Sequence, residues 1–340
     1  MKPYMNEGEL INELVINKKI RRETIPEEIF KERAYTMLVS PYKRLICLNR
    51  HPITKKYLYK ENGDFWEYIN LAKIDDFISN KFSLYIECFE KYFKTYVGEK
   101  LADKLRKTNQ NCNDYSIINS YLDSIPSYME LQHMSISEIN HLEFDTLCYD
   151  LLPFHLMYDK KMKFIHADKN ILLNRRRAFD NLISLNKNRG KSNNVLVQHY
   201  FNNGIVPPIW AIIHTLSLGD IMAIFNTFSR KDRVEITKKM MQKDKVKAIQ
   251  IGKLSAKINT IREIRNTINH YEPLIPFLMK YKDNNQENLI LSILKMLKTF
   301  YQDSTILGVK VIKRKAFIKL SKNDFNKKYI IYTNKIIREI

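Results

Sequence analysis

Apolar residues recur at helical spacing from the start of the chain. Such spacing places them on one face of a helix. The first group of apolar residues therefore predicts a short amphipathic helix, and basic residues follow it in the sequence. A second helix is expected between Pro26 and Arg33. A third is expected from Tyr42 to Leu48, ending before Pro52 because proline disfavours helix in the residue that precedes it. The first amphipathic stripe consists of Leu10, Ile11, Leu14 and Val15.

The longest apolar stripe begins after Asp64, which with Glu67 forms a typical helix start. It predicts one long helix or a broken pair of helices that acts as the central scaffold. We interpret its aromatic residues as core and not as a ligand site. The stripe comprises Phe65, Ile69, Ile74, Phe77, Ile78, Phe82, Leu84, Tyr85, Phe89, Phe93 and Val97.

Helical spacing continues through residues 135–152 and 168–185. The pair Pro207-Pro208 opens a further apolar helix, expected to run to Gly219 or through it to Phe228. Residues 229–247 predict a charged helix that is either a solvated surface or an RNA-facing one. In the C-terminal tail, alternation from Gly308 to Leu320 suits a small hairpin, and the last ten residues suit a helix.

These patterns predict an all-α or mainly α protein. With 8 Gly and 10 Pro, the chain has few turn signals for an all-β fold of 340 residues. We expect an N-terminal helical region over residues 1–110, a second helical region over 111–300, and a basic C-terminal extension over 301–340.

The net charge of +20, from 57 Lys and Arg against 37 Asp and Glu, indicates attraction to a polyanion. Nucleic acid is the leading partner. A base-composition bias of the genome is the alternative explanation for the many lysines. The candidate RNA contacts are Arg175, Arg176, Arg177, Arg262, Lys313, Arg314 and Lys315.

Several classes of protein are disfavoured. The four cysteines are scattered singly, so neither a zinc site nor another metal site is expected, and nothing points to a cofactor. The longest apolar stretch, Ile205 to Leu218, is too short for a membrane span. Residues 1–14 carry three glutamates and do not resemble a signal peptide. A cytoplasmic protein without membrane attachment is expected.

One polar motif stands at a helix end. A stripe predicts a helix from about Ile249 that Pro273 ends, and Arg262, Arg265, Asn266 and His270 lie off that stripe. The stripe consists of Leu254, Ile258, Ile261 and Ile268.

Metal-independent RNA cleavage requires a base, an acid and a cation. Histidine suits proton transfer near neutral pH, and arginine matches two phosphate oxygens. Asn266 is expected to orient the ribose or phosphate. Since one chain supplies a single His270, a homodimer is expected to complete the pair. Arg44 and His51 also have a loose Arg-to-His spacing, but we interpret them as structural, and His199 and His214 are expected to be core residues.

The order of these segments resembles the Abi family of AbiD/AbiF type across roughly residues 1 to 280. The resemblance is carried by the Lys2-Pro3-Tyr4 start, the aromatic helix, and the motif Arg265-Asn266 to His270. It is also carried by the segment from His199-Tyr200 through Pro207-Pro208-Ile209-Trp210 to Gly219.

That family is similar to the HEPN superfamily of helical ribonucleases that serve in phage defence. The resemblance implies a HEPN-like helical bundle with additional N-terminal helices. It also implies that Arg265 and His270 are the catalytic pair at a dimer interface. Asn266 is then the polar residue that often follows the arginine in this family. The family often has Cys-Ala-His-His where this chain has Ile268-Asn269-His270-Tyr271. An RNA-binding protein that holds a structured non-coding RNA without cleaving it is therefore the alternative.

Overall fold

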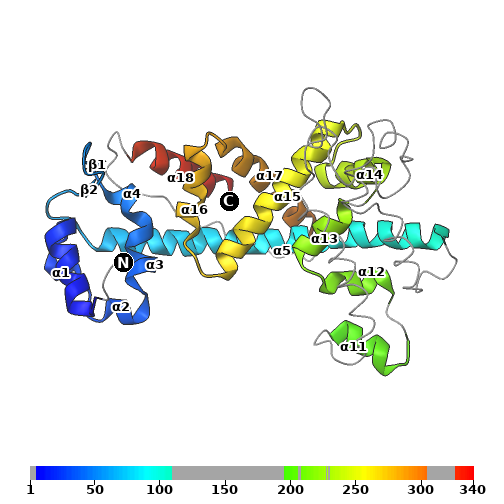
Figure 1. Ribbon diagram of the computed structural model, residues 1–340, viewed down its shortest axis with the longest axis horizontal. Coiled ribbons are helices and arrows are strands. Elements are labelled where there is room, and N and C mark those ends of the chain that lie inside the picture. Colours follow the sequence, from blue (N-terminus) through cyan, green and yellow to red (C-terminus); the bar gives the residue numbers. More distant parts are fainter. Residues whose placement is uncertain (1–4, 109–194, 206–207, 227, 229, 305–325) are drawn as a thin grey trace, which may run out of the picture. The chain divides into compact units, whose positions relative to one another are not determined.

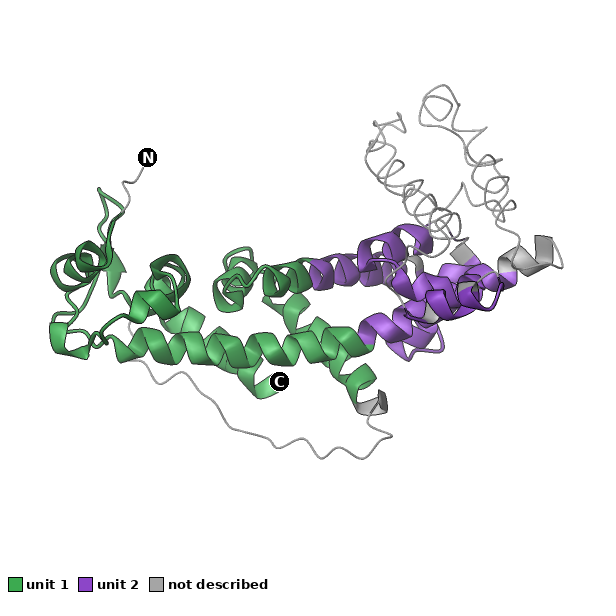
Figure 2. Cartoon of the chain, turned by 90° about the horizontal axis from the view of Figure 1, so that it is seen from below, with its two compact units in different colours: residues 1–88, 263–340 green, residues 89–262 purple. Residues whose placement is uncertain are grey.

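The computed structural model describes residues 5–108, 195–205, 208–226, 228, 230–304 and 326–340. It is mainly helical, which confirms the predicted fold class (Figure 1). The chain forms two compact units (Figure 2). Unit 1 comprises residues 1–88 and 263–340, and unit 2 comprises residues 89–262. The three-part division expected from the sequence stays a prediction.

Unit 1 begins with short helices. Helix α1 (Glu7–Lys18) starts at a capping box in which Asn6 and Glu9 each bond the other's backbone N–H. The helix expected between Pro26 and Arg33 is only the single turn α2, because Glu28 adopts a left-handed conformation, with φ of 58°, and the helix begins only at Ile29. The elements that follow α1 are η1 (Arg22–Thr24), α2 (Ile29–Glu32), α3 (Tyr35–Leu38), η2 (Ser40–Tyr42) and α4 (Lys43–Ile46).

A small antiparallel hairpin follows α4. Strand β1 (Asn49–Arg50) pairs with β2 (Tyr57–Leu58), with Asn49 opposite Leu58 and Arg50 opposite Tyr57. The patterning of the sequence did not predict it, since two-residue strands are too short to show an alternation of apolar and polar positions.

Helix α5 (Trp66–Thr108) is continuous over 43 residues and contributes to both units. The Asp64 carboxylate accepts a hydrogen bond from the N–H of Trp66 at 2.9 Å, as expected of a residue that precedes a helix. Most of the predicted stripe is buried, which confirms its interpretation as core. The buried members are Phe65, Ile78, Phe82, Tyr85, Phe89, Phe93 and Val97.

Helices α16 (Leu274–Asp283), α17 (Glu287–Ser304) and α18 (Lys327–Glu339) pack against one another in unit 1 (Figure 1). The Tyr85 ring of α5 contacts Tyr301, and its hydroxyl donates to the carbonyl of Ile340 at 2.8 Å. The helix predicted for the last ten residues is confirmed as part of α18. The hairpin predicted for residues 308–320 lies outside the described residues.

In unit 2, the expected apolar helix after Pro208 is interrupted. Ser217 and Asp220 form a capping box that starts a new helix, so the prediction of one helix that runs to Gly219, or through it to Phe228, was wrong. Gly98 of α5 lies so close to this segment that an added Cβ would meet Ile213 at 2.7 Å. The elements are α11 (Val195–Asn202), α12 (Ile209–Ile212), η4 (Ile213–Thr215), α13 (Leu218–Phe225) and α14 (Arg230–Met241).

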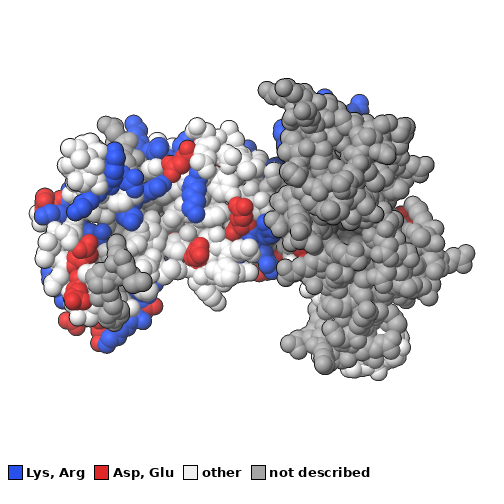
Figure 3. Space-filling view, in the orientation of Figure 1, with Lys and Arg blue, Asp and Glu red and all other residues white. Residues whose placement is uncertain are grey.

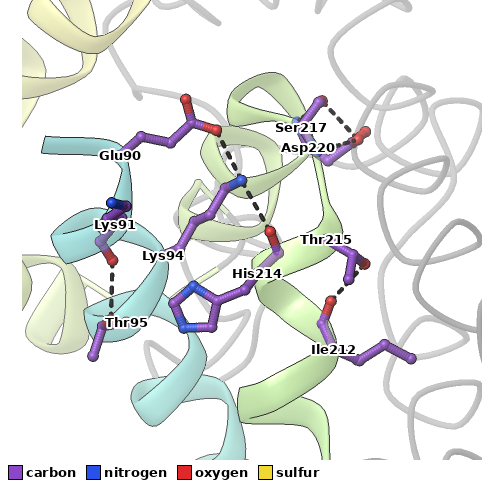
Figure 4. Close-up of polar contacts among 9 residues, drawn as sticks. All are labelled: Glu90, Lys91, Lys94, Thr95, Ile212, His214, Thr215, Ser217 and Asp220. Atoms are coloured by element: carbon purple, nitrogen blue, oxygen red, sulfur yellow. Dashed lines mark hydrogen bonds and ion pairs between the residues drawn. The ribbon is translucent and has the colours of Figure 1, made fainter. Parts of the chain in front are cut away.

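A polar contact joins α5 to this segment (Figure 4). The Lys94 ammonium lies 2.8 Å from the Glu90 carboxylate and donates to the backbone carbonyl of His214 at 3.1 Å. His214 and His199 are both exposed, which corrects their expected place in the core. Although His214 is exposed, neighbouring groups shield part of its ring from water; this desolvation lowers its pKa, and the charge of Lys94 lowers that pKa further.

Among the described helices, none combines the length and the apolar character that a membrane crossing requires.

Candidate functional site at the end of helix α15

Helix α15 (Ala248–Asn269) carries the polar motif. Leu254, Ile258 and Ile261 are fully buried, as expected, and Ile264 continues their stripe. Ile268, the fourth member proposed from the sequence, is only partly buried. The motif residues lie off this stripe, so the helix is anchored through its apolar side while its last turns present polar groups.

The motif residues differ in exposure. Arg265 is partly buried, whereas Asn266 and His270 are exposed. The backbone N–H of His270 donates to the carbonyl of Asn266 at 2.9 Å, so these two residues are held one turn apart at the helix end. Arg262 is exposed, and its side chain lies beside Gly219 in unit 2.

The end of α15 is set by backbone bonds. The N–H of Tyr271 donates to Ile268 O at 2.9 Å and that of Glu272 donates to Thr267 O at 3.0 Å, which together form a Schellman motif. Tyr271 adopts the left-handed conformation that this motif requires, with φ of 56°. The helix therefore ends before Pro273, which instead precedes the first residue of α16.

Side-chain bonds fix the helix end from inside the unit. The Tyr281 hydroxyl of α16 donates to the Glu263 carboxylate at 2.9 Å, two residues before Arg265. The Thr267 hydroxyl donates to the Glu263 carbonyl at 3.0 Å. The turn that carries the motif is therefore tied to α16 and is not a frayed end.

A buried carboxylate anchors the start of α16. Asp75 is 1% exposed, and its Oδ1 accepts from the N–H groups of Leu274 and Ile275 at 2.9 and 3.0 Å. Its Oδ2 accepts from the Tyr42 hydroxyl at 2.7 Å. Burial raises the pKa of Asp75 to about 6, although these three hydrogen bonds act to lower it. We infer that Asp75 fixes the backbone that follows His270.

Sequence reasoning missed Asp75. The signal available was its phase: Leu71, Asp75, Ile78 and Phe82 share one side of α5, so a carboxylate occupies a core position of the stripe. A buried carboxylate requires hydrogen-bond partners, and the sequence did not show which groups would supply them.

The structure describes one of the seven proposed RNA contacts. Of that set only Arg262 is described. The other six lie outside the described residues: Arg175, Arg176, Arg177, Lys313, Arg314 and Lys315.

A basic surface that the sequence reasoning missed covers α4 and the hairpin. Over residues 33–60 the chain contains no Asp or Glu, and Lys and Arg gather over this part of unit 1 (Figure 3). The Arg50 guanidinium lies 4.4 Å from the centroid of the Tyr57 ring, and the Lys43 ammonium lies 5.3 Å from it. We call Lys43, Arg50, Lys55 and Lys56 the basic hairpin surface. The long stretch without an acidic residue was the signal available.

Arg44 and His51, which border this surface, have the structural roles that we expected. Arg44 pairs with Asp283 of α16 at 2.6 Å, and the His51 ring accepts from the N–H of Thr54 at 3.2 Å within the hairpin turn. Burial acts to raise the pKa of the Asp283 carboxyl, but hydrogen bonds from the Tyr329 hydroxyl and Arg44, with the charges of Arg44 and Lys328, hold that pKa below its usual range.

In the part of the chain that the structure describes, His, Cys, Asp and Glu side chains form no group of three that could hold a metal ion. At the end of α15 the motif offers an imidazole, an amide and a guanidinium group.

The model of the Abi-like protein family matches residues 29–276 of the chain. No curated protein and no solved structure matches the chain significantly. The matched range covers most of the chain, including α5, the Asp75 anchor and the motif through His270. The family resemblance expected from the sequence is thereby confirmed, and the chain belongs to the Abi-like protein family.

Proposed function

We propose that this protein is a metal-independent endoribonuclease of HEPN type that acts in abortive-infection defence against phage. Membership of the Abi-like family supports the defence role. The observation that carries the proposed activity is the end of α15, where His270 and Asn266 are exposed on a turn fixed from inside unit 1. The partly buried Arg265 precedes Asn266 directly.

In the proposed reaction a base removes the proton of a ribose 2′-OH, and the 2′-oxygen attacks phosphorus. The bond to the 5′-oxygen breaks, and an acid returns a proton to that oxygen. His270 serves in proton transfer, and Arg265 stabilises the charge on the phosphate oxygens. Asn266 orients the ribose or phosphate by hydrogen bonding.

The reaction uses a base and an acid, whereas each chain supplies one His270. We therefore propose a homodimer in which two motifs form one site. In such a dimer one imidazole accepts the 2′-OH proton while the other, protonated, donates to the leaving oxygen.

The test compares wild type with His270→Ala on total RNA in the presence of EDTA. We expect the substitution to lower the cleavage rate at least about a hundredfold, the lower end of what a positioned acid or base contributes. His199→Ala is a matched control, because His199 is also exposed and lies on α11 of unit 2. Equal cleavage by wild type and His270→Ala would overturn the proposal.

The second candidate is an RNA-binding protein that holds a structured non-coding RNA without cutting it. The basic hairpin surface favours it, because cations arranged over an exposed ribbon suit phosphate contacts without placing a catalytic group. Tight binding of intact RNA by wild type, with no product in EDTA or in Mg²⁺, would favour this candidate.

The same surface provides a measurement for either candidate. Replacing Arg50, Lys55 and Lys56 by Gln should weaken RNA binding and reduce the magnitude of the slope of log affinity against log salt concentration by about two to three. The reason is that each phosphate contact with a duplex releases about 0.9 of a counterion. An unchanged salt dependence would show that the hairpin does not contact RNA.

A further inference from the structure

Three described helices end in the same backbone motif with a residue other than glycine in the left-handed position. For α14, Gln242 donates to Lys239 O at 3.3 Å and Lys243 to Lys238 O at 3.1 Å. For α16, Asn285 donates to Lys282 O at 3.2 Å and Gln286 to Tyr281 O at 2.7 Å. The left-handed residues are Gln242, Tyr271 and Asn285, with φ of 50°, 56° and 55°.

The three positions differ in chemistry. The left-handed conformation suits glycine best, and asparagine tolerates it because a short polar side chain can bond locally. A bulky aromatic residue is the least suited of the three, and the conformation costs a residue with a Cβ roughly 1 kcal/mol. Only the end of α15, which carries His270, has an aromatic residue there.

Packing within the chain does not offset this cost. Tyr271 is 85% exposed, the largest exposed fraction among the exposed large apolar residues of the described chain. An aromatic ring buried in a core contributes stability through the area it removes from water, but this ring lies almost wholly in solvent. In the isolated chain, tyrosine at this position is therefore unfavourable for two reasons: its backbone is left-handed, and its apolar ring is exposed to water.

The position of the ring points to a ligand. Tyr271 follows His270 directly, and the Schellman bonds hold its backbone in one conformation, so the Cα–Cβ bond that carries the ring is fixed at the residue next to His270. Strained residues that persist without a structural reason cluster at functional sites. Aromatic rings beside RNA-cleaving groups suit unpaired bases, because every base has a flat apolar face on which a ring can stack.

We propose that Tyr271 stacks on an unpaired base of the RNA next to the bond that is cut. This inference rests on the proposed function of the His270 site and names its substrate class as single-stranded or looped RNA. Stacking holds the nucleotide so that its ribose and phosphate lie at His270 and Arg265. Since stacking accepts any base, the ring gives affinity and position with little sequence preference.

The experiment separates the ring from the backbone. Tyr271→Gly removes the ring and supplies the residue that the left-handed position prefers, so the protein should unfold at no lower temperature than wild type. Tyr271→Phe keeps the ring. Asn285→Gly is the matched control, because it makes the same backbone change at the end of α16.

Binding is measured with the full-length protein carrying His270→Ala, so that the probe stays intact. The probe is a fluorescently labelled single-stranded RNA of mixed sequence, and a fully paired duplex of the same sequence is the comparison. Tyr271→Gly should lower the affinity for the single strand about 5- to 150-fold, the range of one base stack. Tyr271→Phe should bind the single strand within about twofold of the affinity of the His270→Ala protein, and Asn285→Gly should leave that affinity unchanged.

The outcomes are distinguishable. If Tyr271→Gly binds the single strand as tightly as its parent does, stacking is overturned while cleavage by His270 is untouched. Light scattering reports whether the variant still forms a dimer. If Tyr271→Gly dissociates the dimer but the remaining dimer binds RNA with unchanged affinity, the ring is a subunit contact and stacking is again wrong. If the His270→Ala protein binds no RNA, or if it cleaves RNA as fast as wild type does, the proposed function is overturned and the inference that rests on it falls with it.

Discussion

Two polar groups of unit 1 bracket the turn between α15 and α16 and differ in their surroundings. Asp75 is buried, and three donors satisfy its carboxylate. His270 is exposed at the end of α15, where its backbone N–H completes a helix bond. A side chain that is buried and bonded within the chain acts on the fold, whereas an exposed one remains accessible to a ligand. We therefore expect substitutions of Asp75 to change the stability of the fold and substitutions of His270 to change RNA cleavage.

The largest effect on stability is expected for Asp75→Ala. The substitution leaves the Tyr42 hydroxyl and the N–H groups of Leu274 and Ile275 buried without their acceptor. We expect a loss of about 3 to 5 kcal/mol in the free energy of unfolding, measured by urea denaturation at pH 7. Tyr42→Phe removes one of the three bonds and should cost about 1 to 2 kcal/mol. A loss below about 1 kcal/mol for Asp75→Ala would show that Asp75 is not an anchor.

A second effect concerns pH. Burial raises the pKa of Asp75 from an ordinary value of 3.8 to about 6, so folding favours the protonated carboxyl. Its contribution to stability is therefore fully present below about pH 4 and is lost as the pH rises through about 6. Asp75→Asn cannot titrate. The stability of wild type relative to this variant should fall by about 2 kcal/mol between pH 4 and pH 6.5.

The control for the pH effect is Asp76→Asn. Asp76 is exposed and pairs with Arg33 at 3.0 Å. Its difference from wild type should stay small over the same pH range, since exposed pairs contribute roughly 0 to 1 kcal/mol. A rise in the relative stability of wild type over Asp75→Asn between pH 4 and pH 6.5 would contradict the assigned shift of Asp75.

The same two groups show what the sequence predicted and what it did not. The period of apolar residues located α5 and α15 and placed His270 off the buried stripe, because these are local properties of a helix. The role of Asp75 depends on N–H groups 199 and 200 residues away, which no local pattern reveals. The break at Ser217 was missed because apolar residues continue across it, and a two-residue capping box outweighs that pattern.

A smaller effect is expected at the two comparable helix ends of unit 1. Tyr271→Gly should raise the free energy of unfolding by about 0.5 to 1 kcal/mol, because glycine adopts positive φ without the Cβ clash. Asn285→Gly should change it by only a few tenths, since asparagine already tolerates this conformation. Thermal unfolding of both variants measures the difference. A destabilised Tyr271→Gly would mean that the ring contributes to the fold in spite of its exposure.

The smallest effect on stability is expected at His270 itself. Only the backbone N–H of His270 takes part in the helix-ending bond to Asn266, and alanine keeps that N–H. Substitutions of exposed side chains usually change stability by less than about 0.5 kcal/mol, so urea denaturation should not distinguish His270→Ala from wild type. If cleavage is lost at unchanged stability, the loss belongs to the imidazole. If His270→Ala is instead destabilised by more than about 1 kcal/mol, the imidazole supports the turn as Asp75 does, and the contrast between the two groups fails.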